Sequence, residues 1–200
     1  STPACAHPDE RDVVARFAHA SFRFDDADED TLHDLDFCCR RGQTTAIIGS
    51  TGSGKSTVAK LLLRLHDVTR GRVLLGGCNV RDITQRDLRA RISYVPQKAW
   101  LFSGTVASNL RDGLPNATED QMRHALDVAQ SQFVYDLAGG LDAVVAQGGT
   151  NFSGGQRQRL AIARAIIKPA DLYIFDDSFS ALDFKTDAAL RHALVDEVKN

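Results

Sequence analysis

The sequence contains no long apolar segment. No run of about 18 apolar residues occurs, and the N-terminus lacks the basic and then apolar pattern of a secretory signal. We therefore expect that the chain neither spans a membrane nor crosses one.

The chain also lacks a strong charge of either sign. Its 24 Lys and Arg residues nearly balance its 26 Asp and Glu residues, so the formal net charge is −2. No overall positive field draws it to nucleic acid or to anionic lipid, and we expect no nucleic-acid partner. The 200 residues, 43% of them hydrophobic, are typical of one folded domain, or of one core with an inserted lobe, rather than of a disordered chain.

Cysteine is sparse and has no metal-binding or redox spacing. The four cysteines, Cys5, Cys38, Cys39 and Cys78, form no C-x-x-C pair. The side chains of adjacent Cys38 and Cys39 would point to opposite faces of a strand. We therefore predict reduced thiols in a cytosolic compartment.

The first half of the chain reads as a linker followed by strands and one helix. Ser1 to Asp12 has the composition of a linker, and apolar residues between 13 and 37 predict short strands separated by an acidic loop, Asp25 to Asp30. A β-branched run, Thr44 to Ile48, predicts a strand that ends at a glycine-rich loop. The apolar spacing over Val58 to Leu65 then predicts an amphipathic helix.

The rest of the chain, after Leu65, predicts a helical lobe between further strands. The predicted strands are Val73–Leu75, Ile92–Val95, which Pro96 stops, and Leu172–Phe175. The predicted helices are 119–130 with Thr118 as N-cap, 132–137, 156–168 and 187–198. Leu172–Phe175 is continuously apolar, as a buried parallel strand is. We predict an α/β core with a helical subdomain inserted at about 98–168.

A phosphate-binding loop follows the predicted strand at Thr44–Ile48. The pattern G-x-x-x-x-G-K-[ST] is matched by Gly49, Ser50, Thr51, Gly52, Ser53, Gly54, Lys55 and Ser56. Glycines let successive N–H groups face a phosphate, and the following helix adds positive potential. We expect Lys55 to reach the β- and γ-phosphates of a nucleotide, Ser56 to ligate Mg²⁺, and Thr57 to bind the α-phosphate.

Two carboxylates follow the strand Leu172–Phe175. Asp176 is a candidate for orienting Mg²⁺ in a P-loop site, and Asp177 for polarising the attacking water. The alternative for Asp177 is a solvated carboxylate at a strand end. The segment Ser153-Gly154-Gly155-Gln156 provides a serine N-cap and a free helix N-terminus, which suits a second phosphate but also occurs as a plain turn and cap.

The order of these motifs resembles the nucleotide-binding domain of the ATP-binding cassette (ABC) superfamily. Residues Asn151–Arg159 resemble the family's signature motif, Gln97 its Q-loop glutamine, and Ser180–Asp183 its D-loop. Residues 100–106 are similar to those of exporter-type cassettes, including multidrug and lipid exporters. Phe24 stands where the family usually has a tyrosine that stacks on adenine; the alternative is a core aromatic residue.

The resemblance implies a P-loop NTPase fold, with a RecA-like core, an N-terminal antiparallel β-subdomain and the inserted helical subdomain. It implies a head-to-tail pair of cassettes at the cytoplasmic face of a membrane, joined to a transmembrane domain. ATP and Mg²⁺ would be held by Lys55, Ser56, Gln97 and Asp176, while Ser153, Gly154, Gly155 and Gln156 would contact the ATP of the partner cassette. Lys55, Gln97 and Asp177 would take part in hydrolysis.

Besides Phe24, the sequence departs from the family pattern in three places. Asp177 replaces the usual glutamate, and a carboxylate displaced by ~1 Å predicts a rate lower by about a hundredfold. Gln147 stands where exporters often have an acidic residue. The sequence ends before the family's histidine segment, for which His192 cannot substitute by position, so we expect a cassette within 13–200 that is incomplete at its C-terminus.

These observations leave three functional hypotheses. The first is an ATP-hydrolysing cassette that powers export. The second is a degenerate cassette that binds ATP with little hydrolysis and regulates an unlike partner, which the shorter Asp177 favours. The third, a cassette protein acting on DNA or ribosomes, predicts a basic face, a coiled-coil insertion or a second cassette, and the sequence contains none of these.

Overall fold

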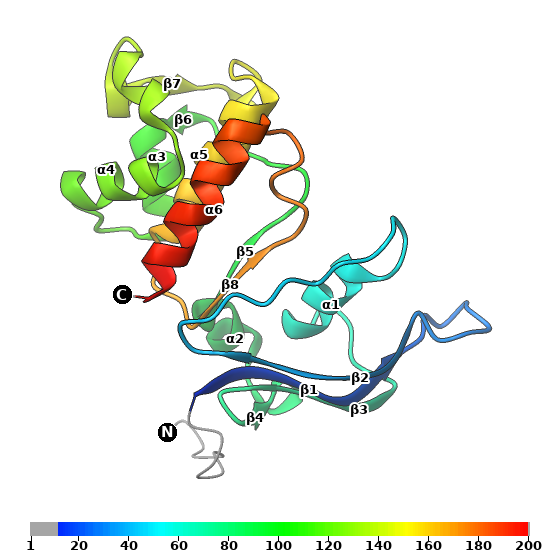
Figure 1. Cartoon of the computed structure of the whole chain (residues 1–200). Helices are drawn as coiled ribbons and strands as arrows, with labels where there is room; N and C mark the ends of the chain where they lie inside the picture. Colours follow the sequence, from blue (N-terminus) through cyan, green and yellow to red (C-terminus); the bar gives the residue numbers. More distant parts are fainter. Residues whose placement is uncertain (1–11, 200) are drawn as a thin grey trace. The chain divides into compact units, whose positions relative to one another are not determined.

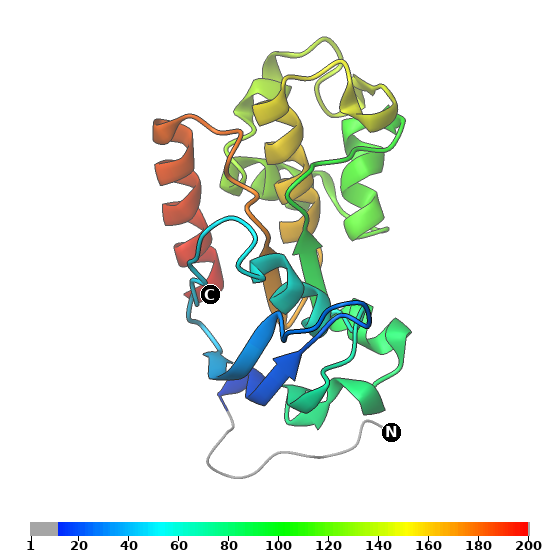
Figure 2. The same cartoon turned by 90° about the vertical axis from the view of Figure 1, so that its right-hand side faces the viewer.

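The computed structural model describes residues 12–199 (Figures 1 and 2). Cys5 and the predicted linker up to residue 11 lie outside this part. The chain forms two compact units that divide between Ile92 and Ser93. No helix in the described part is both long and apolar enough to cross a membrane.

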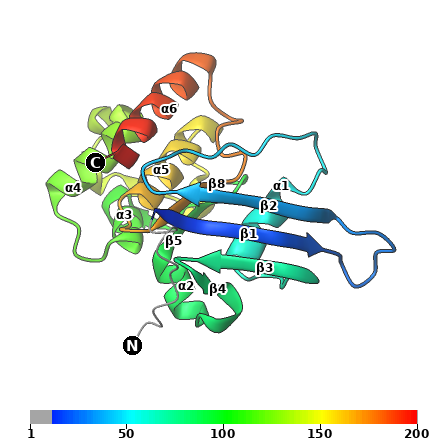
Figure 3. The ribbon, with the colours of Figure 1, turned by 60° about the horizontal axis from the view of Figure 1, so that its bottom comes forward.

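The first unit is built on a four-stranded sheet with the order β2-β1-β3-β4 (Figure 3). Its strands are β1 (Val13–Phe22), β2 (Leu32–Arg40), β3 (Arg70–Leu75) and β4 (Cys78–Asn79), and all neighbouring pairs are antiparallel. Phe17 pairs with Phe37 on one side and with Val73 on the other, and its ring stacks on Phe37 at 4.8 Å. The predicted N-terminal antiparallel β-subdomain is therefore present.

Helix α1 (Lys55–Leu62) packs against β3 and buries Val58, Leu61 and Leu62. The predicted helix extended to Leu65, which the structure places beyond the helix with about half of its surface exposed. A short turn, η2 (Val80–Asp82), and helix α2 (Gln85–Arg91) complete this unit. Thr84 caps α2 by accepting a hydrogen bond from the backbone N–H of Asp87.

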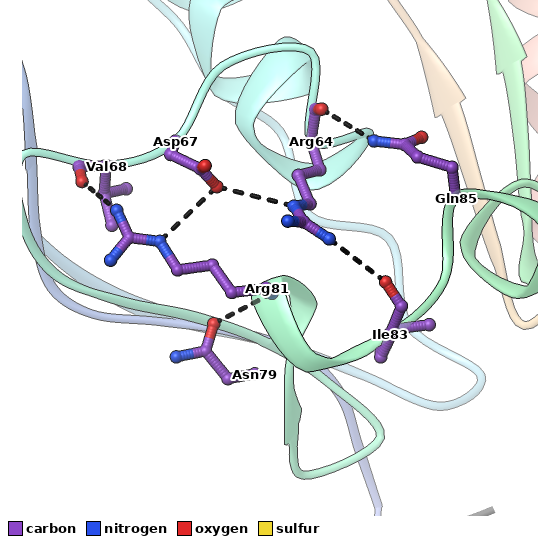
Figure 4. Close-up of polar contacts among 7 residues, drawn as sticks. All are labelled: Arg64, Asp67, Val68, Asn79, Arg81, Ile83 and Gln85. Atoms are coloured by element: carbon purple, nitrogen blue, oxygen red, sulfur yellow. Dashed lines mark hydrogen bonds and ion pairs between the residues drawn. The ribbon is translucent and has the colours of Figure 1, made fainter.

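Three charged side chains hold the loop between α1 and β3 (Figure 4). Asp67 Oδ1 lies 3.6 Å from Arg64 Nε and 3.4 Å from Arg81 Nε. Arg81 also donates to the Val68 carbonyl at 2.5 Å, and Arg64 donates to the Ile83 carbonyl at 3.2 Å. These contacts fix the C-terminal end of α1 to the segment that follows β4.

The strand predicted at Thr44–Ile48 is wrong: residues 43–50 have no strand structure. Ile48 is 91% exposed, whereas a central strand would bury it. A strand exists only where a neighbouring strand supplies a ladder of hydrogen bonds, and β-branched composition alone cannot supply one. The short apolar run therefore indicated a local preference for extended backbone, but not pairing with a neighbouring strand.

The second unit is mainly helical. Its helices are α3 (Val106–Gly113), α4 (Glu119–Val128), α5 (Gly154–Ile166) and α6 (Phe184–Lys199). Helix α5 contacts both α3 and α4, and α4 also contacts α6 (Figure 1). Leu110, Leu126 and Ile162 are almost completely buried in the core that these helices share.

Two small sheets accompany the helices. Strand β5 (Ile92–Val95) pairs with β8 (Leu172–Phe175), and β6 (Gly104–Thr105) pairs antiparallel with β7 (Val144–Val145). Short 3-10 turns lie at η3 (Gln132–Asp136), η4 (Gly140–Asp142) and η5 (Gln147–Gly149). The predicted positions of β5 and β8 are confirmed, but all four residues of β8 are only partly buried, which differs from the expected fully buried strand.

Candidate nucleotide-binding site

The P-loop leads into the N-terminus of α1 with the backbone conformation that its glycines permit. Gly52 has φ 82° and Gly54, the N-cap residue of α1, has φ 89°, both in the left-handed region. A Cβ atom on Gly49 would lie 2.5 Å from Ser53 Oγ, so any other residue there would require the Ser53 side chain to move. The first turn of α1 contains no acidic residue, which leaves its positive end suited to an anion.

Lys55 folds back over the loop that precedes it. Its Nζ donates to the carbonyl oxygens of Gly49 and Ser50, each at 2.7 Å. The ammonium charge is thereby held over the loop backbone. Thr57, two residues further on, is buried, and Ser56 between them is half-buried.

Phe24 belongs to a cluster of three rings in the first unit. It meets Phe22 edge-on at 4.7 Å and His66 edge-on at 5.4 Å, and His66 also lies 5.3 Å from Phe22. Phe24 remains half-buried, so part of its surface is accessible for a base. Sequence reasoning missed His66, because its contact with Phe24 spans more than forty residues and no local pattern marks it.

Strand β5 holds the turn that carries the two predicted carboxylates. The backbone N–H of Asp176 donates to the Val95 carbonyl at 3.0 Å. The Tyr94 hydroxyl donates to Asp176 Oδ2 at 3.1 Å, and the side-chain amide of Gln97 donates to Asp177 Oδ2 at 3.0 Å. The structure thus joins Gln97 to Asp177 and Tyr94 to Asp176, and the sequence analysis did not select Tyr94.

The turn itself is unusual in two respects. Asp177 has φ 48°, a left-handed conformation that is rare for a residue with a side chain. Ser178 is completely buried, and its hydroxyl donates to the Val95 carbonyl at 2.8 Å.

The Tyr94 hydroxyl, on β5, has a raised pKa. Burial, and then the nearby Asp176, raises the pKa of Tyr94 to about 12, so its hydroxyl stays a hydrogen-bond donor at neutral pH.

The predicted signature segment begins helix α5 with a complete capping box. Ser153 Oγ accepts from the Gln156 N–H at 3.2 Å, and Gln156 Oε1 accepts from the Ser153 N–H at 2.9 Å. Within residues 12–199 the structure records no acceptor for the Ser153 hydroxyl proton, which leaves it able to donate to a phosphate. A Cβ atom on Gly155 would lie 3.1 Å from the Ala181 carbonyl, so a glycine lets the D-loop approach.

The donor groups fit ATP and Mg²⁺. The P-loop offers backbone N–H groups and one ammonium, which suit a phosphate, while the Ser56 hydroxyl and the Asp176 carboxylate are hard oxygen donors. Because the Gln97 amide nitrogen is used by Asp177, its carbonyl oxygen is the atom left for a metal. Among the described residues no three His, Cys, Asp or Glu side chains form a metal cluster, and Mg²⁺ bound to ATP requires only one or two protein carboxylates.

The fold and the P-loop define a P-loop nucleotide-binding domain. Residues 32–180 match the family model described as ABC transporter, and the chain belongs to this family. Its domains generally bind ATP and Mg²⁺. The fold class predicted from the sequence is confirmed.

Relatives of known sequence and structure agree with this assignment. An uncharacterized ABC transporter ATP-binding protein of Mycobacterium bovis is 53% identical over 90% of this chain and 31% of its own length. An ATP-dependent lipid A-core flippase of Haemophilus ducreyi is 38% identical over 92% of the chain and 32% of its own length. A bacterial Atm1-family ABC exporter solved with ATP bound has a TM-score of 0.88 and 34% identity, covering the whole chain and 35% of its own. The chain therefore spans about a third of the length of these relatives.

Proposed function

We propose that this chain is the ATP-binding and ATP-hydrolysing cassette of an exporter, working as one of a head-to-tail pair at the cytoplasmic face of a membrane. The observation that carries the proposal is the P-loop, in which glycine conformations, a free helix N-terminus and the Lys55 ammonium meet at one loop. The similarity to a lipid A-core flippase and to an Atm1-family exporter supports export as the process that is powered. The partners would be a second cassette and a transmembrane domain.

The chain's own residues divide the work of hydrolysis. Lys55 and backbone N–H groups of the P-loop bind the triphosphate, and Phe24 offers a ring face to the adenine. Ser56, Asp176 and the Gln97 carbonyl would hold Mg²⁺, which when bound neutralises charge on the phosphates. The free hydroxyl proton of Ser153 would bind the γ-phosphate of the ATP held by the partner cassette.

Asp177 is the residue that would orient the attacking water, and its observed contact bears on the rate. Its Oδ2 already accepts the Gln97 amide, and the side chain is one methylene shorter than the usual glutamate. A base placed ~1 Å short of its water loses on the order of a hundredfold in rate. We therefore propose slow hydrolysis at this P-loop, with binding of ATP unaffected.

Release of phosphate from Mg-ATP tests this function in three variants. We expect Lys55→Ala to lower the rate by at least about a hundredfold, because it removes a charge that binds the transferred group, and Asp177→Glu to raise it. Lys60→Ala is the matched control: it removes an ammonium from the same helix but away from the loop. Equal rates in wild type and Lys55→Ala would overturn the proposal. Lys55-dependent binding of ATP without phosphate release, even in Asp177→Glu, would indicate a regulatory cassette instead.

A further inference from the structure

The chain has three tyrosines, and their hydroxyl groups have different partners. Tyr173, on β8, donates to the backbone carbonyl of Lys168, five residues earlier in the chain, at 2.7 Å. Tyr135 donates to Asp127 Oδ1 at 3.0 Å on the surface of the helical lobe. Tyr94, on β5, donates to Oδ2 of Asp176, the carboxylate proposed to hold Mg²⁺.

We propose that Tyr94 is a positioning residue for Asp176: its hydroxyl fixes the plane of the carboxylate that receives Mg-ATP. This inference rests on the proposed function and adds a residue that no motif of the chain includes. Tyr94 would act through Asp176 and would touch neither the nucleotide nor the metal.

The geometry supports this role because one strand holds both the backbone and the side chain of Asp176. The Val95 carbonyl accepts the Asp176 N–H at 3.0 Å and the Ser178 hydroxyl at 2.8 Å. With the backbone held in this way, the carboxylate keeps rotation about χ1 and χ2, and the preferences of χ2 are broad. The hydrogen bond from Tyr94 to Oδ2 restricts that rotation.

The tyrosine ring is suited to this task. It has only two side-chain torsions, and Tyr94 is half-buried in a strand whose other residues, Ile92, Ser93 and Val95, are buried. The position of its hydroxyl is therefore well defined, and little side-chain conformational entropy is lost when it forms the hydrogen bond to Asp176. Groups that orient a metal-binding carboxylate typically contribute about 10- to 100-fold to metal affinity. For Mg²⁺, which ATP itself holds in part, we expect the lower end of that range.

The experiment measures Mg²⁺-dependent binding of a fluorescent ATP analogue, trinitrophenyl-ATP, with wild type and Tyr94→Phe. The expected result is a rise of about tenfold in the Mg²⁺ concentration at half-maximal binding, with unchanged binding in EDTA. Tyr173→Phe removes a half-buried hydroxyl from the neighbouring strand and is the matched control, for which no change is expected. Identical Mg²⁺ titrations of wild type and Tyr94→Phe would overturn the inference.

Two further variants separate the possible causes of a change. In an Asp176→Ala background, Tyr94→Phe should have no additional effect on the Mg²⁺ titration, because its target is gone; an additional effect would contradict positioning through Asp176. Lys55→Ala should weaken binding both with Mg²⁺ and in EDTA. If wild type and Lys55→Ala bind the analogue equally, the proposed function fails, whereas a failure confined to Tyr94→Phe leaves it intact.

Discussion

At the scale of single residues, two glycines of the second unit mark places where the backbone of another segment lies against a helix. A Cβ atom on Gly113, the last residue of α3, would lie 2.3 Å from the Arg164 carbonyl of α5. At Gly155 the corresponding distance to the Ala181 carbonyl is 3.1 Å, and at Gly154 the nearest atom, Ala181 Cβ, is 3.9 Å away. Of these three glycines, only Gly113 lies so close to the backbone of another helix that an added methyl group has no space.

Gly113→Ala should therefore destabilise the second unit by about 3 kcal/mol, because an added methyl group forces α3 and α5 apart. Gly154→Ala, in the first turn of α5, has space for its methyl group and should change stability by less than about 1 kcal/mol. Urea unfolding followed by the fluorescence of Trp100, the single tryptophan, measures both. Equal unfolding midpoints for the two variants would show that α3 and α5 can separate at little cost.

At the scale of secondary-structure elements, three helices of the second unit begin with capping boxes. They pair Thr105 with Ser108 at α3, Thr118 with Gln121 at α4, and Ser153 with Gln156 at α5. Each box satisfies backbone N–H groups that a helix start leaves without a partner. The cap of α5 differs from the other two only in its proposed second task, contact with the γ-phosphate of the partner's ATP.

Ser153→Ala and Thr118→Ala should separate these two tasks. Each variant removes one side-chain cap and should lower the unfolding free energy by about 1 kcal/mol. Only Ser153→Ala should also weaken ATP-dependent pairing of cassettes, measured by light scattering in the presence of Mg-ATP. If Thr118→Ala weakens pairing equally, the effect comes from stability and the role proposed for Ser153 is wrong.

The elements also show what could and could not be predicted from the sequence. The P-loop pattern, the cap Thr118 and the helix predicted at 156–168, which the structure places at 154–166, depend on residues within a few positions of one another, and local spacing indicated them. The strand at Thr44–Ile48 was wrong, because pairing depends on a distant segment. Tyr94 and His66 were missed for the same reason: the contact between Tyr94 and Asp176 joins residues 82 positions apart, and one sequence does not show that register.

At the scale of the whole molecule, ionisation of the tyrosines links the stability of the native state to high pH. Burial is the largest cause of the raised pKa of each: it brings those of Tyr94 and Tyr135 to about 12 and raises that of Tyr173 as well. In the unfolded chain all three ionise near pH 10. Between about pH 10 and pH 12 the unfolded state therefore holds fewer protons, and native stability falls as pH rises.

Absorbance at 295 nm, recorded against pH, should show little tyrosinate at pH 10 in the native protein and an increase toward pH 12. In denaturant the increase should be centred near pH 10. In native Tyr94→Phe the absorbance increase toward pH 12 should be smaller, and there should still be little increase at pH 10. A native titration centred near pH 10 would show that the three hydroxyls are more accessible to water than the structure indicates.

One short segment, residues 94–97, supplies the Tyr94 hydroxyl, the Val95 carbonyl and the Gln97 amide, all of which contact Asp176, Asp177 or Ser178. Since a strand rises about 3.3 Å per residue, inserting or deleting a single residue here would misplace all of these groups by more than a hydrogen bond can accommodate. This stretch should therefore tolerate some exchanges of side chains but no change in length.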